Sequence, residues 1–228
     1  MSGPASPAAG PRPTIRPNVW AVIPVKVLAE GKSRLASVLS NPERARLNRE
    51  FFLHTLQTAG HSERLARIVV VSADPEVRAL ASEAGARVLV EAPPLGLNRA
   101  LGQGASEALA NGASHVLSLS IDLPHLTAGD LDDLIASALA NEPPSVTVAT
   151  DEAGQGTNAM VVAPPEIVTY HYGRDSLARH RAAAERAGAD FTVVHRVALQ
   201  FDVDSPEDLR RWREAGSGSA VEPGARRA

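Results

Sequence analysis

Short apolar runs, rich in β-branched residues, alternate with longer mixed stretches along most of the chain. Runs of this kind are typical of buried strands, and the stretches between them predict helices. The first run, Val19–Pro24, ends at a proline, which has no N–H to give to a sheet ladder. Further strands are predicted at 67–72, 86–90, 115–120, 145–149, 157–162 and 191–199.

Capping residues mark where the helices begin. Asn41 precedes Pro42, which suits an N-cap followed by a proline in the first turn. Thr127 with Asp130 three residues later resembles a capping box, and Ser205 precedes another proline. Helices are predicted at 41–59, 74–84, 98–110, 127–139 and 176–187, with a last helix starting after Ser205.

The alternation of strands and helices predicts an α/β fold, a Rossmann-like three-layer α/β/α sandwich with a mostly parallel sheet. No helix separates 145–149 from 157–162, so we expect a local antiparallel excursion, placed at the sheet edge. We expect one domain at 18–215, with a disordered leader at 1–17 and a disordered tail at 216–228. Ligands of such folds bind beyond the carboxyl ends of the strands.

Composition narrows the function. The chain has 228 residues, with 23 Lys and Arg against 26 Asp and Glu, so a general nucleic-acid-binding role is not expected. No cysteine is present, which excludes thiolate metal sites and cysteine nucleophiles. The seven histidines lack the close spacing of a zinc site. No apolar run approaches the length of about 20 residues that a membrane span needs, and no signal peptide is expected, so we predict a cytoplasmic protein.

A cationic loop follows the first strand. Lys26, Lys32 and Arg34 surround Gly31. Cations beside a glycine can hold a phosphate, because the side chains neutralise charge while backbone N–H groups approach the anion. The pattern is not a Walker A motif, which would need an additional upstream glycine. A solvated basic loop explains these residues equally well.

Two other positions are candidates for ligand binding. Asp122 directly follows the strand at 115–120 and precedes a proline turn, a place where a carboxylate can bind a divalent cation or simply cap a turn. Gly173 to Ser176 stand at a predicted helix start, where free N–H groups and a hydroxyl can receive an anion.

Several short motifs, spread over 19–209, occur together in one known family. They are Ile23-Pro24-Val25-Lys26, Gly31-Lys32-Ser33-Arg34-Leu35, Leu97-Asn98, Asp122-Leu123-Pro124, Gly156-Thr157-Asn158, Tyr172-Gly173 with Ser176, Arg179-His180, and Asp202-Val203-Asp204. With them the chain resembles the GT-A-like nucleotidyltransferases. It is most similar to the 2-phospho-L-lactate guanylyltransferase family, which includes the phosphoenolpyruvate and 3-phospho-D-glycerate guanylyltransferases of coenzyme F-420 biosynthesis.

The resemblance implies a nucleotide side of the site. Lys26, Lys32 and Arg34 would hold the triphosphate of GTP. The turn that carries Leu97 and Asn98 would face guanine and ribose.

The resemblance also implies a metal site and an acceptor site. Asp122 and Asp204 would hold Mg²⁺, with Asp202 either a further partner or the direct ligand in place of Asp204. The carboxylate or phosphate of a small phospho-acid would be received by Thr157, Gly173 and Ser176. His180 could help to hold the acceptor, but a position on the helix surface is the favoured interpretation.

Two positions depart from the family pattern. Ile121 stands where the family usually has glycine, and Gln155 changes the usual Gly-Thr-Gly-Thr before Thr157.

Nucleotidyl transfer agrees with what the chain contains. The phosphate dianion of the acceptor is already a nucleophile, so positioning and charge neutralisation suffice. Another nucleotidyltransferase of the fold (molybdenum-cofactor, cobinamide or sugar type) and a nucleotide-binding regulatory protein without turnover remain alternatives. The segment 172–180 argues against the first, and the presence of both Asp122 and Asp204 argues against the second. The choice of phospho-acid, and of monomer or homodimer, stays open.

Overall fold

The structure, a computed structural model, describes residues 17–217. The predicted leader and tail therefore lie almost wholly outside the described residues. Seven strands form one sheet in the order β3-β2-β1-β4-β6-β5-β7. The strands are β1 (Val19–Pro24), β2 (Leu65–Ser72), β3 (Arg87–Val90), β4 (His115–Leu119), β5 (Ser145–Ala149), β6 (Ala159–Ala163) and β7 (Asp190–Val194).

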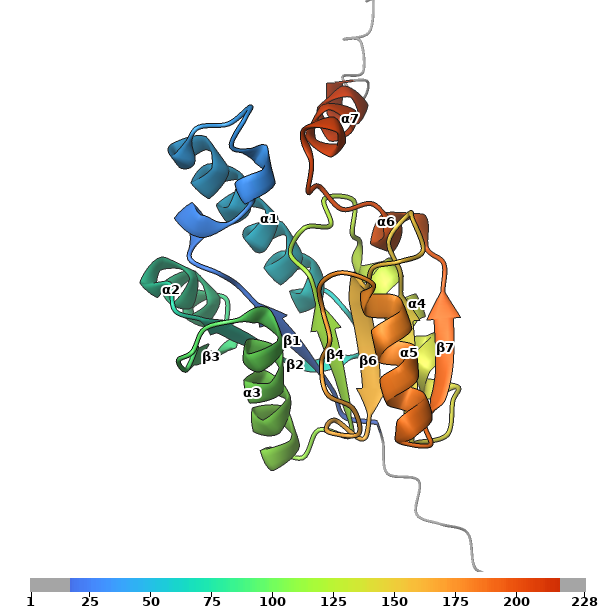
Figure 1. Cartoon of the computed structure of the whole chain (residues 1–228). Coiled ribbons are helices and arrows are strands. Elements are labelled where there is room, and N and C mark those ends of the chain that lie inside the picture. Colours follow the sequence, from blue (N-terminus) through green and yellow to red (C-terminus); the bar gives the residue numbers. More distant parts are fainter. Residues whose placement is uncertain (1–16, 218–228) are drawn as a thin grey trace, which may run out of the picture.

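Helices cover both faces of this sheet (Figure 1). They are α1 (Asn41–Gly60), α2 (Pro75–Glu83), α3 (Leu97–Ala110), α4 (Ala128–Leu139), α5 (Ser176–Arg186), α6 (Val197–Gln200) and α7 (Pro206–Ser217), with the 3₁₀ turns η1 (Leu28–Glu30) and η2 (Ser33–Leu35). No helix among residues 17–217 has the length and hydropathy to cross a bilayer. The predicted three-layer α/β/α sandwich is thus confirmed.

Successive side chains of a strand point to opposite faces of the sheet, so one strand packs against both layers of helices. In β1, Ala21 and Ile23 pack with α1, α2 and α4, whereas Trp20 and Val22 pack with α3 and α5. Gly104 of α3 lies so close to β1 that an added Cβ would come within 2.3 Å of Val22. The small residues of α3 therefore let this helix lie close to the sheet.

The antiparallel strand is present but not at the edge. β6 runs antiparallel to both of its neighbours, β4 and β5, and all the other strand pairs are parallel. Every residue of β6 is buried, so this strand needs a neighbour on each side. β7, most of which is only partly buried, takes the edge instead. The placement at the edge was therefore wrong.

Two local predictions also need correction. Ser40, not Asn41, is the N-cap of α1, and the Glu43 carboxylate accepts from the Ser40 backbone N–H at 2.8 Å and from its hydroxyl at 2.6 Å. The strand predicted at 191–199 ends at Val194, and the short helix α6 follows. This strand ends there because Ala149, the last residue of its partner β5, pairs with Val194.

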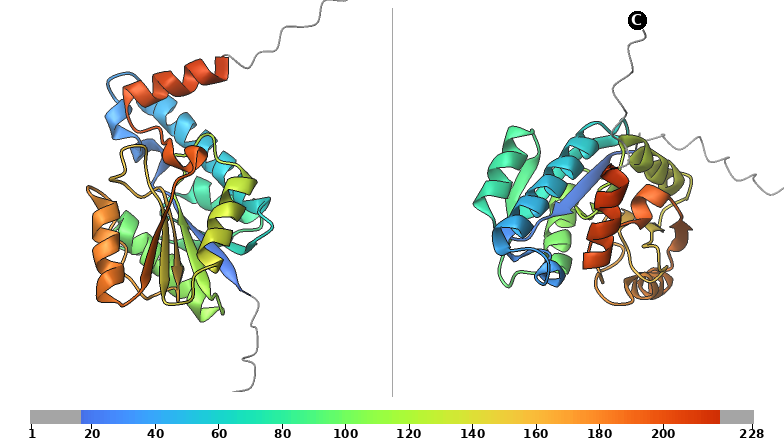
Figure 2. Two further views of the ribbon diagram at one scale, coloured as in Figure 1. Left: turned by 90° about the vertical axis from the view of Figure 1, so that its right-hand side faces the viewer. Right: turned by 90° about the horizontal axis from the view of Figure 1, so that it is seen from above.

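The loops that carry the candidate site meet at one rim. This rim contains the carboxyl ends of β1, β4, β5 and β7 and, because β6 is antiparallel, the start of β6. A small apolar cluster joins the loop after β1 to α1 and α7; it contains Leu35, Leu39, Leu47, Phe51, Phe201, Val203 and Leu209, with Trp212 packed against it. Seen from above (Figure 2, right), α7 lies between α1 and α6.

Candidate active site

The residues 25–40, here called the basic loop, place one cation in the interior. The Lys32 ammonium forms an ion pair with Asp122 Oδ1 and donates to the carbonyl oxygen of Val203 at 2.7 Å. Its side chain is only 3% exposed and lies over the ring of Phe51. Lys32 has φ 51° and ψ 42°, a left-handed conformation that costs a residue with a side chain about 1 kcal/mol. These contacts hold Lys32 in that conformation.

The other two predicted cations face solvent. Lys26 is exposed, and the Arg34 side chain is 76% exposed, with its Nη1 3.5 Å from Asp204 Oδ2. An exposed pair of this kind contributes little to stability. Lys26 and Arg34 are therefore available to an incoming anion, whereas Lys32 would have to exchange partners.

Gly31 has a structural reason of its own. An added Cβ would come within 2.4 Å of the amide nitrogen of Asn48, which donates to the carbonyl of Leu28 at 2.7 Å. Arg44 donates to the Gly31 carbonyl at 2.9 Å. Close packing against α1 thus explains the glycine, independently of any phosphate.

Opposite the basic loop lies an acidic cluster, formed by Asp122, Asp151, Asp202 and Asp204. Burial and, after it, the carboxylates of Asp204 and Asp122 together raise the pKa of Asp202 to about 6, against a hydrogen bond from Asn158 that lowers it. Burial and the Asp122 carboxylate also raise the pKa of Asp204, while Lys32 and Arg34 lower it. Like charges held this close favour an additional cation.

A backbone contact between distant parts of the chain holds the acidic cluster together. The N–H of Val203 donates to the carbonyl of Asp122 at 3.1 Å, which joins the two Asp-bearing segments directly. Ile121, the departure from the family pattern, packs against the core that α1, α2 and α4 cover. Gly156 lies beside Asp151, whose carboxylate would be 2.6 Å from an added Cβ.

Residues 17–217 contain no group of three or more His, Cys, Asp or Glu side chains arranged to hold a metal ion. Mg²⁺ does not need such a cage, since it usually takes one or two protein carboxylates and completes its shell with water and substrate phosphates. Asp122 and Asp204, brought to one rim, fit that requirement, although in this structure each carboxylate has a cation beside it, Lys32 and Arg34 respectively.

The acceptor side, which contains the predicted acceptor residues Thr157, Gly173 and Ser176, is held by hydrogen bonds between neutral groups and not by ion pairs. Thr157 precedes β6 and is buried, and its Oγ1 lies 3.0 Å from Nδ1 of His180. The other ring nitrogen of His180, Nε2, accepts from the backbone N–H of His171 at 2.9 Å. His180 is fully buried, so its favoured interpretation as a helix-surface residue was wrong. The interior face of α5 carries it.

Asn98 joins the two sides. Its Oδ1 accepts from the backbone N–H of Tyr172 at 2.7 Å, and its Nδ2 donates to the carbonyl of the same residue at 3.2 Å. The Tyr172 hydroxyl lies 2.6 Å from Ser118 Oγ in the sheet. The side-chain amide of Asn98 is thus engaged by residues 164–175, here called the acceptor loop. Its neighbour Leu97 is more than a third exposed at the start of α3.

Gly173 and Ser176 stand at the start of α5. Gly173 is exposed with φ 121°, in the region that favours glycine, and Ser176 is the first residue of the helix. The N–H of Leu177 donates to the carbonyl of Gln155 at 3.0 Å, so one of the N–H groups at this helix start is already satisfied. The same bond brings the turn before Thr157 against α5.

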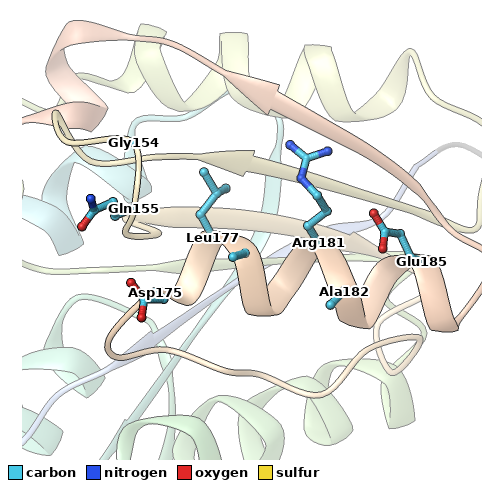
Figure 3. Close-up of a pocket in the computed structure, with 8 residues that line it drawn as sticks. Gly154, Gln155, Asp175, Leu177, Arg181, Ala182 and Glu185 are labelled. Atoms are coloured by element: carbon cyan, nitrogen blue, oxygen red, sulfur yellow. The ribbon is translucent and has the colours of Figure 1, made fainter.

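A pocket of about 270 Å³ lies between this turn and α5 (Figure 3). The residues that line it include none of the predicted site residues; they are Gly154, Gln155, Asp175, Leu177, Ala178, Arg181, Ala182 and Glu185. The candidate site is therefore defined by the rim and its charges, and not by this pocket.

The side-chain pairings of this network carried no signal in the sequence. Ser118 and Tyr172 meet only because β4 and the acceptor loop lie side by side, far apart in the chain. The pairing of Asn98 with Tyr172 spans 74 residues. His180 could have been found from the 3.6-residue period of α5, since Ala183 and Ala184 on the same helix are also buried.

Comparison with known proteins gives consistent results. The family model described as guanylyl transferase CofC like matches residues 19–221. A phosphoenolpyruvate guanylyltransferase of Rubrobacter xylanophilus is 40% identical, covering 87% of this chain and 95% of its own. One of Sphaerobacter thermophilus is 38% identical, covering 83% of this chain and 89% of its own.

Solved structures share the fold at low identity. A nucleotidyl transferase from Methanothermobacter has a TM-score of 0.63 at 15% identity, covering 89% of this chain and 99% of its own. A 4-diphosphocytidyl-2C-methyl-D-erythritol synthase from Anaerococcus prevotii has a TM-score of 0.62 at 10% identity, covering 88% of this chain and 96% of its own. At these identities the likeness concerns the fold alone.

Proposed function

The chain belongs to the family of CofC-like guanylyl transferases, and we propose that it transfers GMP from GTP to the phosphate of phosphoenolpyruvate, releasing pyrophosphate. The choice of phosphoenolpyruvate among the three phospho-acids rests on the two relatives described above. Both are phosphoenolpyruvate guanylyltransferases, and the match covers most of their length. We further propose that the product serves coenzyme F-420 biosynthesis and that the reaction takes place in the cytoplasm.

One observation carries the proposal. A basic loop with two exposed cations faces an acidic cluster across a rim that also holds the neutral polar groups of the acceptor side. Nucleotidyl transfer needs three kinds of group in one site: cations for a triphosphate, carboxylates for a metal ion, and hydrogen-bond donors for an anionic acceptor.

In the proposed reaction, an oxygen of the phosphoenolpyruvate phosphate attacks the α-phosphorus of GTP. The bond from that phosphorus to the oxygen bridging to the β-phosphorus breaks, and pyrophosphate leaves with both electrons of that bond. The attacking dianion needs no general base, so the chain supplies position and charge. Lys26 and Arg34, the exposed cations, would neutralise the β- and γ-phosphates.

Asp122 and Asp204 would hold Mg²⁺, which when bound supplies positive charge at the triphosphate. The Lys32 ammonium, now paired with Asp122, would turn toward the phosphates once that carboxylate has another partner. On the acceptor side, Thr157, Gly173 and Ser176 would receive the phospho-acid through a hydroxyl, a backbone N–H and the start of α5. Leu97 and the turn around it would lie against the nucleoside.

Pyrophosphate release tests the proposal directly. The purified chain is mixed with GTP and Mg²⁺ and with phosphoenolpyruvate, 2-phospho-L-lactate or 3-phospho-D-glycerate, each in a separate reaction, with ATP and CTP in place of GTP as controls. We expect release that requires GTP and phosphoenolpyruvate together. Release with another phospho-acid alone would correct the acceptor, and release with none of the three would refute the proposed reaction.

A further inference from the structure

The inference concerns the hydroxyl of Thr157 and the imidazole behind it. Thr157 Oγ1 lies 3.0 Å from His180 Nδ1, and both residues are buried. A hydroxyl can donate one hydrogen bond and accept two. Which of these roles Thr157 keeps for a ligand depends on whether His180 donates to it or accepts from it.

The hydrogen bond at the other ring nitrogen, Nε2, decides whether His180 donates to Thr157 or accepts from it. The backbone N–H of His171 points at His180 Nε2, at 2.9 Å. A backbone N–H can only donate, so Nε2 must be the unprotonated nitrogen of the ring. In a neutral imidazole the proton is then on Nδ1, and Nδ1–H donates to Thr157 Oγ1.

The surroundings keep the ring neutral. His180 is fully buried on α5, with the edge of the Tyr172 ring against it at a centroid distance of 5.0 Å. The imidazole of His171, at 6.2 Å, and the guanidinium of Arg179 are the charged or titratable groups that act on it. Burial, with these two neighbours, lowers the pKa of His180 to about 4, so the ring carries no charge near neutral pH.

We propose that His180 is a positioning residue that fixes the Thr157 hydroxyl as a hydrogen-bond donor to the anionic phospho-acid. Because Thr157 Oγ1 already accepts from Nδ1–H, its own hydrogen must point elsewhere, and an anion at the rim can take it. This inference rests on the proposed function, since it deepens the acceptor role given to Thr157.

In the protein without substrate, the Thr157 hydroxyl is already oriented for the acceptor. A hydroxyl whose hydrogen is already directed at the subsite does not have to reorient when the anion binds, so the binding free energy is not reduced by that step. The acceptor loop benefits too, because the same imidazole holds the His171 backbone, two residues before Gly173.

Substitutions at position 180 can separate the two bonds of the ring. His180→Gln carries a carbonyl that can still accept from the His171 N–H, but it removes the donor to Thr157. His180→Asn carries an amide N–H near the place of Nδ1 and can still donate to Thr157, but it gives up the His171 bond. We expect the KM for phosphoenolpyruvate to rise about tenfold in His180→Gln, the equivalent of one hydrogen bond, and less than threefold in His180→Asn. The kcat and the KM for GTP should change by less than a factor of two.

A double-substitution cycle with Thr157→Val tests whether His180 acts through Thr157. If it does, adding His180→Gln to Thr157→Val should raise the KM for phosphoenolpyruvate no further. Effects that multiply, or a fall in kcat with both KM values raised together, would overturn the inference and indicate a structural role only.

A spectroscopic measurement is independent of turnover. The ¹⁵N chemical shifts of the His180 ring in the wild-type chain report which nitrogen carries the proton. We expect protonated Nδ1 and bare Nε2 at pH 7; the other tautomer or a charged ring would overturn the inference. If the wild-type chain released no pyrophosphate with any phospho-acid, the proposed function would fail, while this measurement would still decide the tautomer.

Discussion

The nucleotide side and the acceptor side of the rim are held by different forces. On the nucleotide side, the basic loop rests on an apolar cluster and presents charges: Arg34 is 76% exposed, and Lys32 is paired with a carboxylate of the acidic cluster. On the acceptor side, the buried Thr157 and His180 and the partly buried Asn98 are neutral and form hydrogen bonds whose donors and acceptors are already matched.

The difference indicates two modes of binding. A triphosphate and a metal ion bring large charges, so the groups that meet them can be exposed and can exchange partners on binding. A small phospho-acid offers few atoms, so its discrimination requires donors fixed in advance by the surrounding structure. We expect substitutions on the two sides to affect different substrates.

The largest effect is expected in the acidic cluster. Asp122→Asn and Asp204→Asn each remove a charge at the proposed metal site while keeping the side-chain shape. Mg²⁺-dependent pyrophosphate release should fall on the order of 10²- to 10³-fold, because charge stabilisation is the main contribution to this reaction. Asp133→Asn, at an exposed ion pair with Arg196 on the side of α4, is the matched control. Full activity in both site variants would show that the metal-site assignment is wrong.

Acid should destabilise the folded chain through His180. The pKa of His180 is about 4 in the folded chain, below its ordinary value of 6.5, so the unfolded chain binds more protons between these values. The contribution of His180 to the free energy of unfolding should be constant above pH 6.5. It should fall by about 3 kcal/mol in total as the pH decreases toward 4.

His180→Asn should remove this part of the pH dependence, as urea unfolding at several pH values can measure. His115, whose pKa is also lowered by burial, contributes to both proteins alike. The exposed His61, changed to Asn, serves as control. Equal slopes in the wild-type chain and in His180→Asn would contradict the neutral, buried imidazole.

Stability should distinguish Lys32 from Arg34, two of the three cations of the basic loop. Lys32→Met leaves the Asp122 carboxylate without its partner in a largely buried place, which should lower the free energy of unfolding by about 2 kcal/mol. Arg34→Met removes an exposed charge and should change it by less than about 0.5 kcal/mol. Thermal or urea unfolding of the two variants compares them directly. Equal losses of unfolding free energy would show that the Lys32–Asp122 pair stabilises the fold no more than the exposed Arg34–Asp204 pair.

The smallest effect tests the link between the sides. Asn98→Asp keeps an acceptor for the Tyr172 N–H but replaces the donor to the Tyr172 carbonyl with a second oxygen. The KM for phosphoenolpyruvate should rise about tenfold, a loss near 1.4 kcal/mol, with a smaller change in the KM for GTP. Should the KM for GTP rise instead, Asn98 would act on the nucleotide, as the family resemblance implies.

Local patterns were enough to predict most of the fold. Apolar runs located every strand except β7, whose predicted end was five residues too late, to within two residues, and the Thr127–Asp130 capping box was as predicted. The place of β6 in the sheet was not accessible, because no short-range signal says which strand it will pair with. The N-cap of α1 was missed by one residue, since Ser40 and Asn41 are both good caps and the Glu43 carboxylate decides between them.

The sequence named residue types for the site, but it did not show which of these residues pair with one another. The motifs name Asp122 and Asp204, and the hydrogen bond from the Val203 N–H to the Asp122 carbonyl joins their segments at one rim. That Lys32 would pair with Asp122 depends on how the basic loop folds back. The burial of His180 likewise depends on how Thr157, 23 residues earlier in the chain, and the acceptor loop pack against α5. Long-range contacts, and not residue identity, decided these roles.

The most direct test of the central claim follows a labelled phosphorus atom. The chain in excess is mixed with Mg²⁺, phosphoenolpyruvate and GTP labelled with ³²P at either the α- or the γ-phosphorus, and the products are separated after one turnover. Guanylyl transfer predicts that the α-label appears in the product containing phosphoenolpyruvate and the γ-label in pyrophosphate. If the γ-label appeared on the acceptor, or the α-label remained in GTP or GDP, the account would be contradicted.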